Sequence, residues 1–109
     1  MTYLAMTRGD DRVLDVTATE DLTGANLYFT VRHRRYTPDP PLITKATDGD
    51  GIELGTPTTA EITIDAADTV GLDPDVGYWD LVVIDSADKT YTIASGRFAI
   101  VEDVDHHTA

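Results

Sequence analysis

A strict two-residue alternation runs through the stretch Ala25-Asn-Leu-Tyr-Phe-Thr-Val-Arg-His33. Its odd-numbered side chains, from Ala25 to Val31, are apolar, whereas the even-numbered ones, from Asn26 to Arg32, are polar or amphipathic. Because successive side chains of a β-strand point to opposite faces, this pattern predicts an antiparallel strand with one face in the core. The strand sets the expectation of an all-β fold.

The same period of two recurs along the rest of the chain. It predicts seven or eight short strands, over residues 13–18, 25–33, 42–46, 52–54, 60–64, 78–85, 90–94 and 97–101, separated by Gly, Pro and Asp turns. A break is expected at Gly96. One helical turn is expected over residues 65–70, with Asp65 as its N-cap and Gly71 at its end. This pattern predicts an antiparallel sandwich or small barrel with less than about a tenth of its residues in helix.

The apolar positions that share a strand face predict the hydrophobic core. We expect it to contain Leu14, Val16, Leu27, Phe29, Val31, Ile62, Ile64, Trp79, Leu81, Val83, Ile93, Phe98 and Ile100. The segment 78–85 is apolar on both faces, so we expect a central strand. Its second face, with Tyr78, Val82 and Ile84, should be covered by the second sheet or by a partner chain.

The length of 109 residues fits a single domain over residues 1–109. Its core pattern covers about residues 7–101, and residues 1–6 and 102–109, which lack the alternation, are expected to be terminal arms. No apolar run approaches the roughly 20 residues needed to span a bilayer. The chain contains no cysteine, so it has no disulfide and no thiolate nucleophile, and we expect it to be made in a cytoplasm.

Charge is unevenly distributed along the chain. The formal net charge is -12, and residues 36–109 carry fifteen acidic groups against three basic ones. Such a surface repels nucleic acid and anionic membranes, so neither is expected as a partner. A basic region beside an acidic remainder favours head-to-tail packing between copies. The alternative is a solvated surface that its charge keeps soluble.

The residues that carry chemistry in enzymes do not form a recognisable site. Most carboxylates occupy turns, where Asp is favoured for its local hydrogen bonds, and a small sandwich leaves little room for a water-excluding cleft. The run Asp48-Gly-Asp-Gly51 lacks the third oxygen ligand of a calcium loop, because Ile52 stands there. Adjacent His106 and His107 do not alone supply tetrahedral metal geometry. We therefore expect a non-enzymatic protein with no catalytic, cofactor-binding or metal-binding residues.

The segment Arg32-His-Arg-Arg35 is the only basic cluster, and a stiff proline-rich loop, Tyr36 to Pro41, follows it. Arginine pairs bidentately with carboxylates, and a stiff loop loses little entropy on docking. The sequence therefore predicts a subunit contact at this segment, with a solvated strand end as the alternative. The expected interface residues are Arg32, Arg34, Arg35, Tyr36, Pro38, Pro40 and Pro41.

Several short motifs occur in a familiar order. They are Thr7-Arg-Gly-Asp10, Asp21-Leu-Thr-Gly-Ala25, Asp65-Ala-Ala-Asp68, Gly77-Tyr-Trp-Asp-Leu81 and Thr92-Ile-Ala-Ser-Gly96. Over about residues 7–101 the chain resembles the N-terminal domain family of upper baseplate proteins of long-tailed bacteriophages and related small virion structural proteins. The resemblance implies an immunoglobulin-like antiparallel β-sandwich that serves as a virion building block and carries no catalytic residues.

Two functions remain open. The first is a bacteriophage structural protein, present in several copies, that docks on other virion subunits as a capsid decoration, head–tail accessory or tail or baseplate component. The second is a ligand- or carbohydrate-binding module for host attachment. Aromatic residues on one exposed flat face favour the second, whereas an apolar patch completed by a partner chain favours the first.

Overall fold

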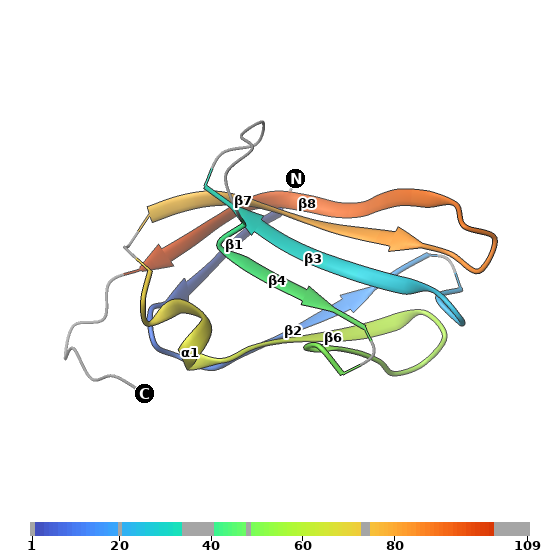
Figure 1. The fold of residues 1–109 in the computed structure, drawn as a ribbon, viewed down its shortest axis with the longest axis horizontal. Coiled ribbons are helices and arrows are strands. Elements are labelled where there is room, and N and C mark those ends of the chain that lie inside the picture. The colour runs from blue at the N-terminus through green and yellow to red at the C-terminus, as the bar shows by residue number, and fades with distance from the viewer. Residues whose placement is uncertain (1, 20, 34–40, 48, 73–74, 102–109) are drawn as a thin grey trace.

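The computed structural model describes residues 2–19, 21–33, 41–47, 49–72 and 75–101. Strands account for 62% and helix for 5% of this structure, and two sheets pack face to face (Figure 1). The predicted all-β sandwich and its low helix content are confirmed. The elements are β1 (Thr2–Thr7), β2 (Arg12–Thr17), β3 (Asn26–Arg32), β4 (Ile43–Ala46), β5 (Ile52–Leu54), β6 (Thr59–Ile64), α1 (Ala66–Thr69), β7 (Asp75–Ile84) and β8 (Thr90–Val101).

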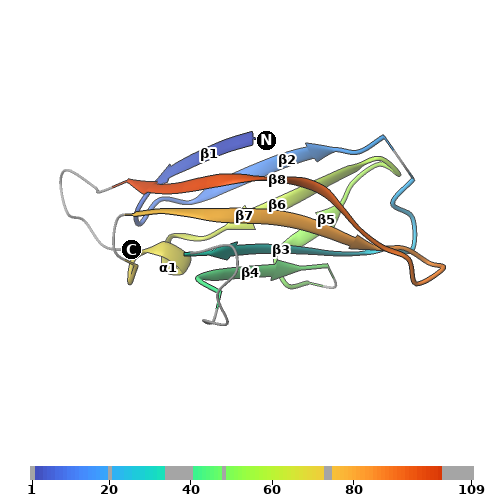
Figure 2. The same ribbon diagram turned by 90° about the horizontal axis from the view of Figure 1, so that it is seen from above.

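The strands form a five-stranded sheet in the order β1-β8-β7-β3-β4 and a three-stranded sheet in the order β2-β6-β5. Figure 2 shows the strands of the larger sheet side by side. Among the described strands, β1 and β8 pair in parallel and the other pairs are antiparallel. If β3, β7 and β8 are matched to strands C, F and G of immunoglobulin domains, β2, β6 and β5 match B, E and D.

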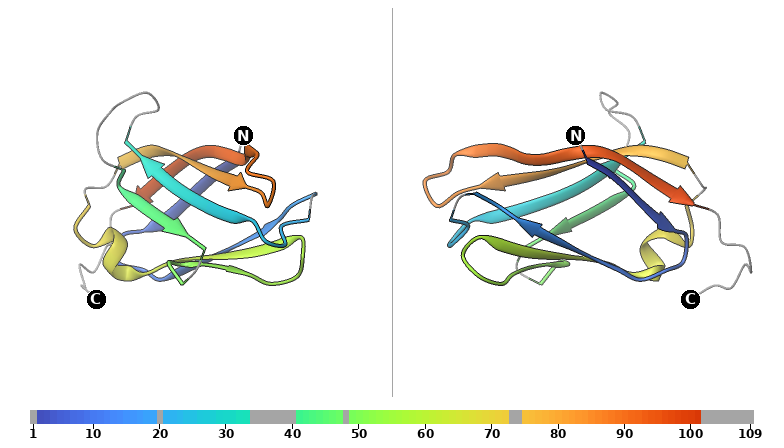
Figure 3. Two further views of the ribbon diagram at one scale, coloured as in Figure 1. Left: turned by 45° about the vertical axis from the view of Figure 1, so that its right-hand side comes forward. Right: turned by 180° about the vertical axis from the view of Figure 1, so that it is seen from behind.

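Strand β1 corrects the expectation of an N-terminal arm over residues 1–6. Its register along β8 runs from Thr2 opposite Gly96 to Thr7 opposite Val101, and Met6 is buried in the core. Figure 3 shows β1 beside β8 at the edge of the larger sheet. The arm was expected because the segment is short and mixed in polarity, but the edge of β8 supplies backbone partners that satisfy its hydrogen-bonding groups. The expected C-terminal arm, 102–109, lies outside the described residues.

Strand β8 is continuous, so the expected break at Gly96 is wrong. Leu81 of β7 lies opposite Ala94, but Val82 lies opposite Thr92. Ile93 is therefore an extra residue on β8, which is a β-bulge. The irregularity in this strand is thus the bulge at Ile93, three residues before Gly96. A bulge bends a strand without ending it.

The predicted core residues are buried, except that Val16 and Ile93 are half-buried and pack against its margin. At its centre the ring centroid of Phe29 lies 5.7 Å from that of Trp79 and 6.4 Å from that of Phe98. The prediction missed six further side chains of the core: Met6, Leu22, Ala25, Ile43, Ile52 and Ala60.

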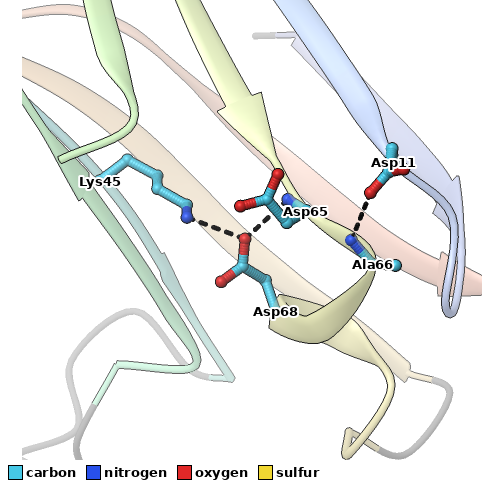
Figure 4. Close-up of polar contacts among 5 residues, drawn as sticks. All are labelled: Asp11, Lys45, Asp65, Ala66 and Asp68. Atoms are coloured by element: carbon cyan, nitrogen blue, oxygen red, sulfur yellow. Dashed lines mark hydrogen bonds and ion pairs between the residues drawn. The ribbon is translucent and has the colours of Figure 1, made fainter. Parts of the chain in front are cut away.

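Two of the four connections between the sheets, the one from β1 to β2 and the one from β6 to β7, meet at one end of the sandwich. The turn after β1 enters the three-stranded sheet, and α1 returns the chain to the larger one. An oxygen of Asp11, Oδ1, accepts a 2.7 Å hydrogen bond from the backbone N–H of Ala66 (Figure 4). The Gly9 N–H donates to the hydroxyl of buried Thr69 at 2.9 Å. These bonds join two segments that are far apart in the sequence.

Asp68 links α1 to strand β4. Its Oδ2 atom accepts a 2.7 Å hydrogen bond from the N–H of Asp65 and lies 2.8 Å from Nζ of Lys45 (Figure 4). The Lys45 side chain is 12% exposed, so this ion pair is screened less than a surface pair. Asp65 is the N-cap as predicted, but the helix ends at Thr69 with Val70 as its C-cap, one residue before Gly71.

Candidate protein-interaction surface

The predicted interface is only partly described. Arg34, Arg35, Tyr36, Pro38 and Pro40 lie outside the described residues. Arg32 ends β3 and is half-buried, as is Pro41 at the far side of the loop.

The two ends of that loop are held to the larger sheet. The backbone N–H of Leu42 donates to the carbonyl oxygen of Val31 at 2.7 Å. Nδ1 of His33 lies 3.1 Å from Oδ2 of Asp75, at the start of β7. The described residues on either side of the loop therefore lie at the end of this sheet where β3 finishes and β7 starts.

Arg32 belongs to a row of four residues on the outer face of the five-stranded sheet. In the strand register Arg32 lies opposite Tyr78, Tyr78 opposite Arg97, and Arg97 opposite Tyr3. All four point away from the core, because their strand neighbours Val31, Trp79, Phe98 and Leu4 belong to the inward-facing set. We call these residues the Arg–Tyr row; it crosses β3, β7, β8 and β1.

Apolar and aromatic groups surround the Arg–Tyr row on the same face. Tyr28 lies opposite Val82, one of the β7 residues that we expected to be covered. The second sheet does not cover that β7 face: Tyr78, Val82 and Ile84 are half-buried and point away from it. The exposed large hydrophobic side chains on this face are Tyr3 at 62%, Val101 at 48%, Val76 at 43% and Tyr28 at 41%, which shows how much apolar surface meets solvent.

Asp80 is the acidic group in the middle of this face. It lies opposite Thr30, between the Arg–Tyr row and the Tyr28–Val82 pair. Desolvation by its neighbours raises the pKa of the Asp80 carboxyl, and the positive charge of Arg32 partly offsets this rise. Asp80 is half-buried, so this part of the face is partly shielded from water even in the single chain.

The outer face of the three-stranded sheet has the opposite character. Asp15 lies opposite Glu61, and Glu61 lies opposite Glu53 on the other side. All three side chains are exposed, and we call them the acidic row. Among the described residues, no basic group lies within ion-pair distance of them.

Two motifs behind the family resemblance have structural roles. Asp10 and Gly9, in the first motif, form the turn after β1, where the Asp10 N–H donates to the Thr7 carbonyl. Asp65 and Asp68, in the third motif, start α1, and Asp68 also pairs with Lys45. These polar residues are used in joining the two sheets.

Neither a metal cluster nor a membrane helix is found in the part of the chain that the structure describes. Within it, no group of three His, Asp or Glu side chains is arranged to hold a metal ion. The described helix is too short to cross a membrane. Comparisons with models of protein families and with curated protein sequences find no match for this chain.

Sequence reasoning found one member of the Arg–Tyr row, Arg32, as a predicted interface residue. Tyr78 was predicted to lie on the face of its strand opposite to Trp79. Arg97 and Tyr3 were not predicted to belong to an interface. The alternation of Arg97 with buried Phe98 was a usable signal for an outward side chain. Tyr3 gave no such signal, because its strand was not predicted.

Proposed function

We propose that this chain is a non-enzymatic structural subunit of a bacteriophage virion, which works by docking on other protein subunits. The observation that carries the docking role is the outer face of the five-stranded sheet. It combines Tyr, Arg and partly exposed aliphatic side chains, the composition that protein interfaces favour. The virion assignment is supported by the motif resemblance alone.

Several virion positions fit this role equally well: capsid decoration, head–tail accessory, and tail or baseplate component. In each of them a small sandwich would be made in the host cytoplasm and would join the particle in several copies. The loop at residues 34–40, which begins after His33, belongs to the proposed docking region because both ends of it are held at this sheet.

The test is incorporation into particles. Particles are purified from the producing bacterium and the chain is quantified by mass spectrometry, with cryo-electron microscopy to place it. The proposal expects a fixed copy number in particles, and a chain that is abundant in the lysate but missing from washed particles contradicts it. Replacement of Arg32, Arg34 and Arg35 by Ser should lower incorporation in a salt-dependent way. Lys89→Ser, an exposed change in a hairpin, is the control.

A second function, carbohydrate binding for host attachment, is favoured by the three tyrosines on the same face, Tyr3, Tyr28 and Tyr78. Aromatic rings on an exposed sheet give sugars an apolar surface on which to stack. Titration with host surface glycans distinguishes the two functions. Sugar binding should be lost in Tyr28→Ala and insensitive to salt, whereas protein docking should depend on the arginines and weaken with salt.

A further inference from the structure

The spacing of the Arg–Tyr row is set by the sheet. Arg32 and Arg97 lie on β3 and β8, with Tyr78 of β7 between them. Neighbouring strands are about 4.8 Å apart, so the backbones of the two arginines are separated by roughly 10 Å. The row therefore presents two guanidinium groups with a phenol between them on the outer face.

The acidic row has the same spacing on the opposite side of the sandwich. Asp15 and Glu53 lie on β2 and β5, with Glu61 of β6 between them. Like charges that lie directly opposite one another on a sheet are destabilising. Basic groups supplied from outside this sheet would relieve that repulsion.

The two rows lie on the outer faces of the two sheets, and these sheets are opposite layers of the sandwich (Figure 1), so one chain cannot bring the rows together. We infer that copies of this chain stack face to back, with the Arg–Tyr row of one copy on the acidic row of the next. This inference rests on the proposed docking function. It states that the protein docked on this chain is a second copy of the same chain. Arg32 and Arg97 would pair with the outer carboxylates, and the Tyr78 hydroxyl would donate to the central one.

This contact is heterologous, because each copy uses two different surfaces. Such contacts build rows, and they close into rings where the rotation between copies allows it. The partly exposed Val82 and Ile84 lie farther along the same face, beyond Asp80, so apolar burial adds to the charge pairing. Salt screens the charge pairing between the Arg–Tyr row and the acidic row, so the association should be strongest at low salt.

The experiment uses two charge-reversed variants of the full chain and sedimentation velocity. Arg32→Glu/Arg97→Glu makes both faces acidic, and Glu53→Lys/Glu61→Lys makes both faces basic. Each variant alone should self-associate about tenfold more weakly than the wild type, or worse. An equimolar mixture should recover association, because the unchanged basic face of one variant meets the unchanged acidic face of the other.

Matched controls carry the same change of net charge at exposed positions outside both rows. They are Arg12→Glu/Lys89→Glu and Asp10→Lys/Asp50→Lys. Both controls should associate like the wild type. Circular dichroism melting of every variant shows whether it is folded, and the second reversed pair keeps the test valid if the first does not fold.

Three results would overturn the inference. The first is a wild-type chain that stays monomeric up to about 1 mM at low salt. The second is normal self-association of Glu53→Lys/Glu61→Lys, which would point to a face-to-face contact through the larger sheet. The third is a mixture that associates no better than its components. Incorporation into particles without self-association refutes the stacking and keeps the proposed function, whereas self-association of a chain missing from particles refutes the virion role.

Discussion

The Oδ1 atom of Asp11 accepts a 2.7 Å hydrogen bond from the backbone N–H of Ala66, 55 residues further along the chain. Asp11 belongs to the turn that leaves the five-stranded sheet, and Ala66 begins the helix that precedes the return to it. The first N–H groups of a helix have no partner within the helix, so this long-range bond satisfies one of them. It also fastens the connection between β1 and β2 to the connection between β6 and β7.

Removing this acceptor should destabilise the sandwich. We expect Asp11→Ala to lower the free energy of unfolding by about 1 kcal/mol, because the partly buried Ala66 N–H loses its partner. Urea denaturation followed by Trp79 fluorescence measures the change. The control is Asp10→Ala at the exposed neighbouring position, with an expected effect within about 0.5 kcal/mol. Equal effects of the two substitutions would show that the Asp11 bond adds no stability.

Phe29 and Tyr28 are adjacent residues with opposite roles. Phe29 is fully buried against Trp79 and Phe98, so Phe29→Ala should cost about 3–4 kcal/mol by opening a cavity. Tyr28 points to the outer face and is 41% exposed, so Tyr28→Ala should cost about 1 kcal/mol or less. Thermal and urea unfolding of both variants tests this. A Phe29→Ala loss below about 1 kcal/mol would be incompatible with a ring at the centre of the core.

Strand β1 should contribute to stability. Met6 is 4% exposed in the core, so Met6→Ala should lower the free energy of unfolding by about 2 kcal/mol. Tyr3→Ala, on the exposed face of the same strand, is the control and should change it by less than about 0.5 kcal/mol. Chemical denaturation measures both. Were Met6→Ala as harmless as Tyr3→Ala, the segment would behave as the arm that the sequence suggested.

Asp80 should make the stability depend on pH. Desolvation raises the pKa of Asp80 in the folded state above the ordinary Asp value of about 3.9. The protonated form therefore stabilises the fold below the ordinary value. This stabilisation is lost as pH rises through the folded-state pKa. Urea denaturation at a series of pH values measures this loss of stability, and Asp80→Asn should not show it. In a carboxyl NMR titration, Arg32→Ser should raise the Asp80 pKa further, because the Arg32 charge lowers it. An unchanged or lower pKa would contradict the assignment.

Most of the sandwich was predictable because burial on one face of a strand leaves a period of two in the sequence. The clean alternation from Ala25 to Val31 identified β3, and its inward side chains proved to be the centre of the core. The capping position of Asp65 was also predictable, because it depends on residues within one helical turn.

The missed features depend on partners far away in the chain. Strand β1 lacks a clear alternation of apolar and polar side chains and exists because the edge of β8, more than 90 residues later, pairs with it. The bulge at Ile93 is visible only as a change of register against β7. A register shift moves side chains between faces, so no local pattern reveals it in advance.

The sequence by itself determined most of the strands, most of the side chains that face inward, and that the chain is strongly acidic. Only the tertiary structure decided which strands are neighbours, and therefore that Arg32, Tyr78, Arg97 and Tyr3 form one row while Asp15, Glu61 and Glu53 form another. The physical reason is that alternation is a property of a single strand. Cross-strand register, by contrast, is set by long-range pairing and by the connections that carry the chain between the sheets.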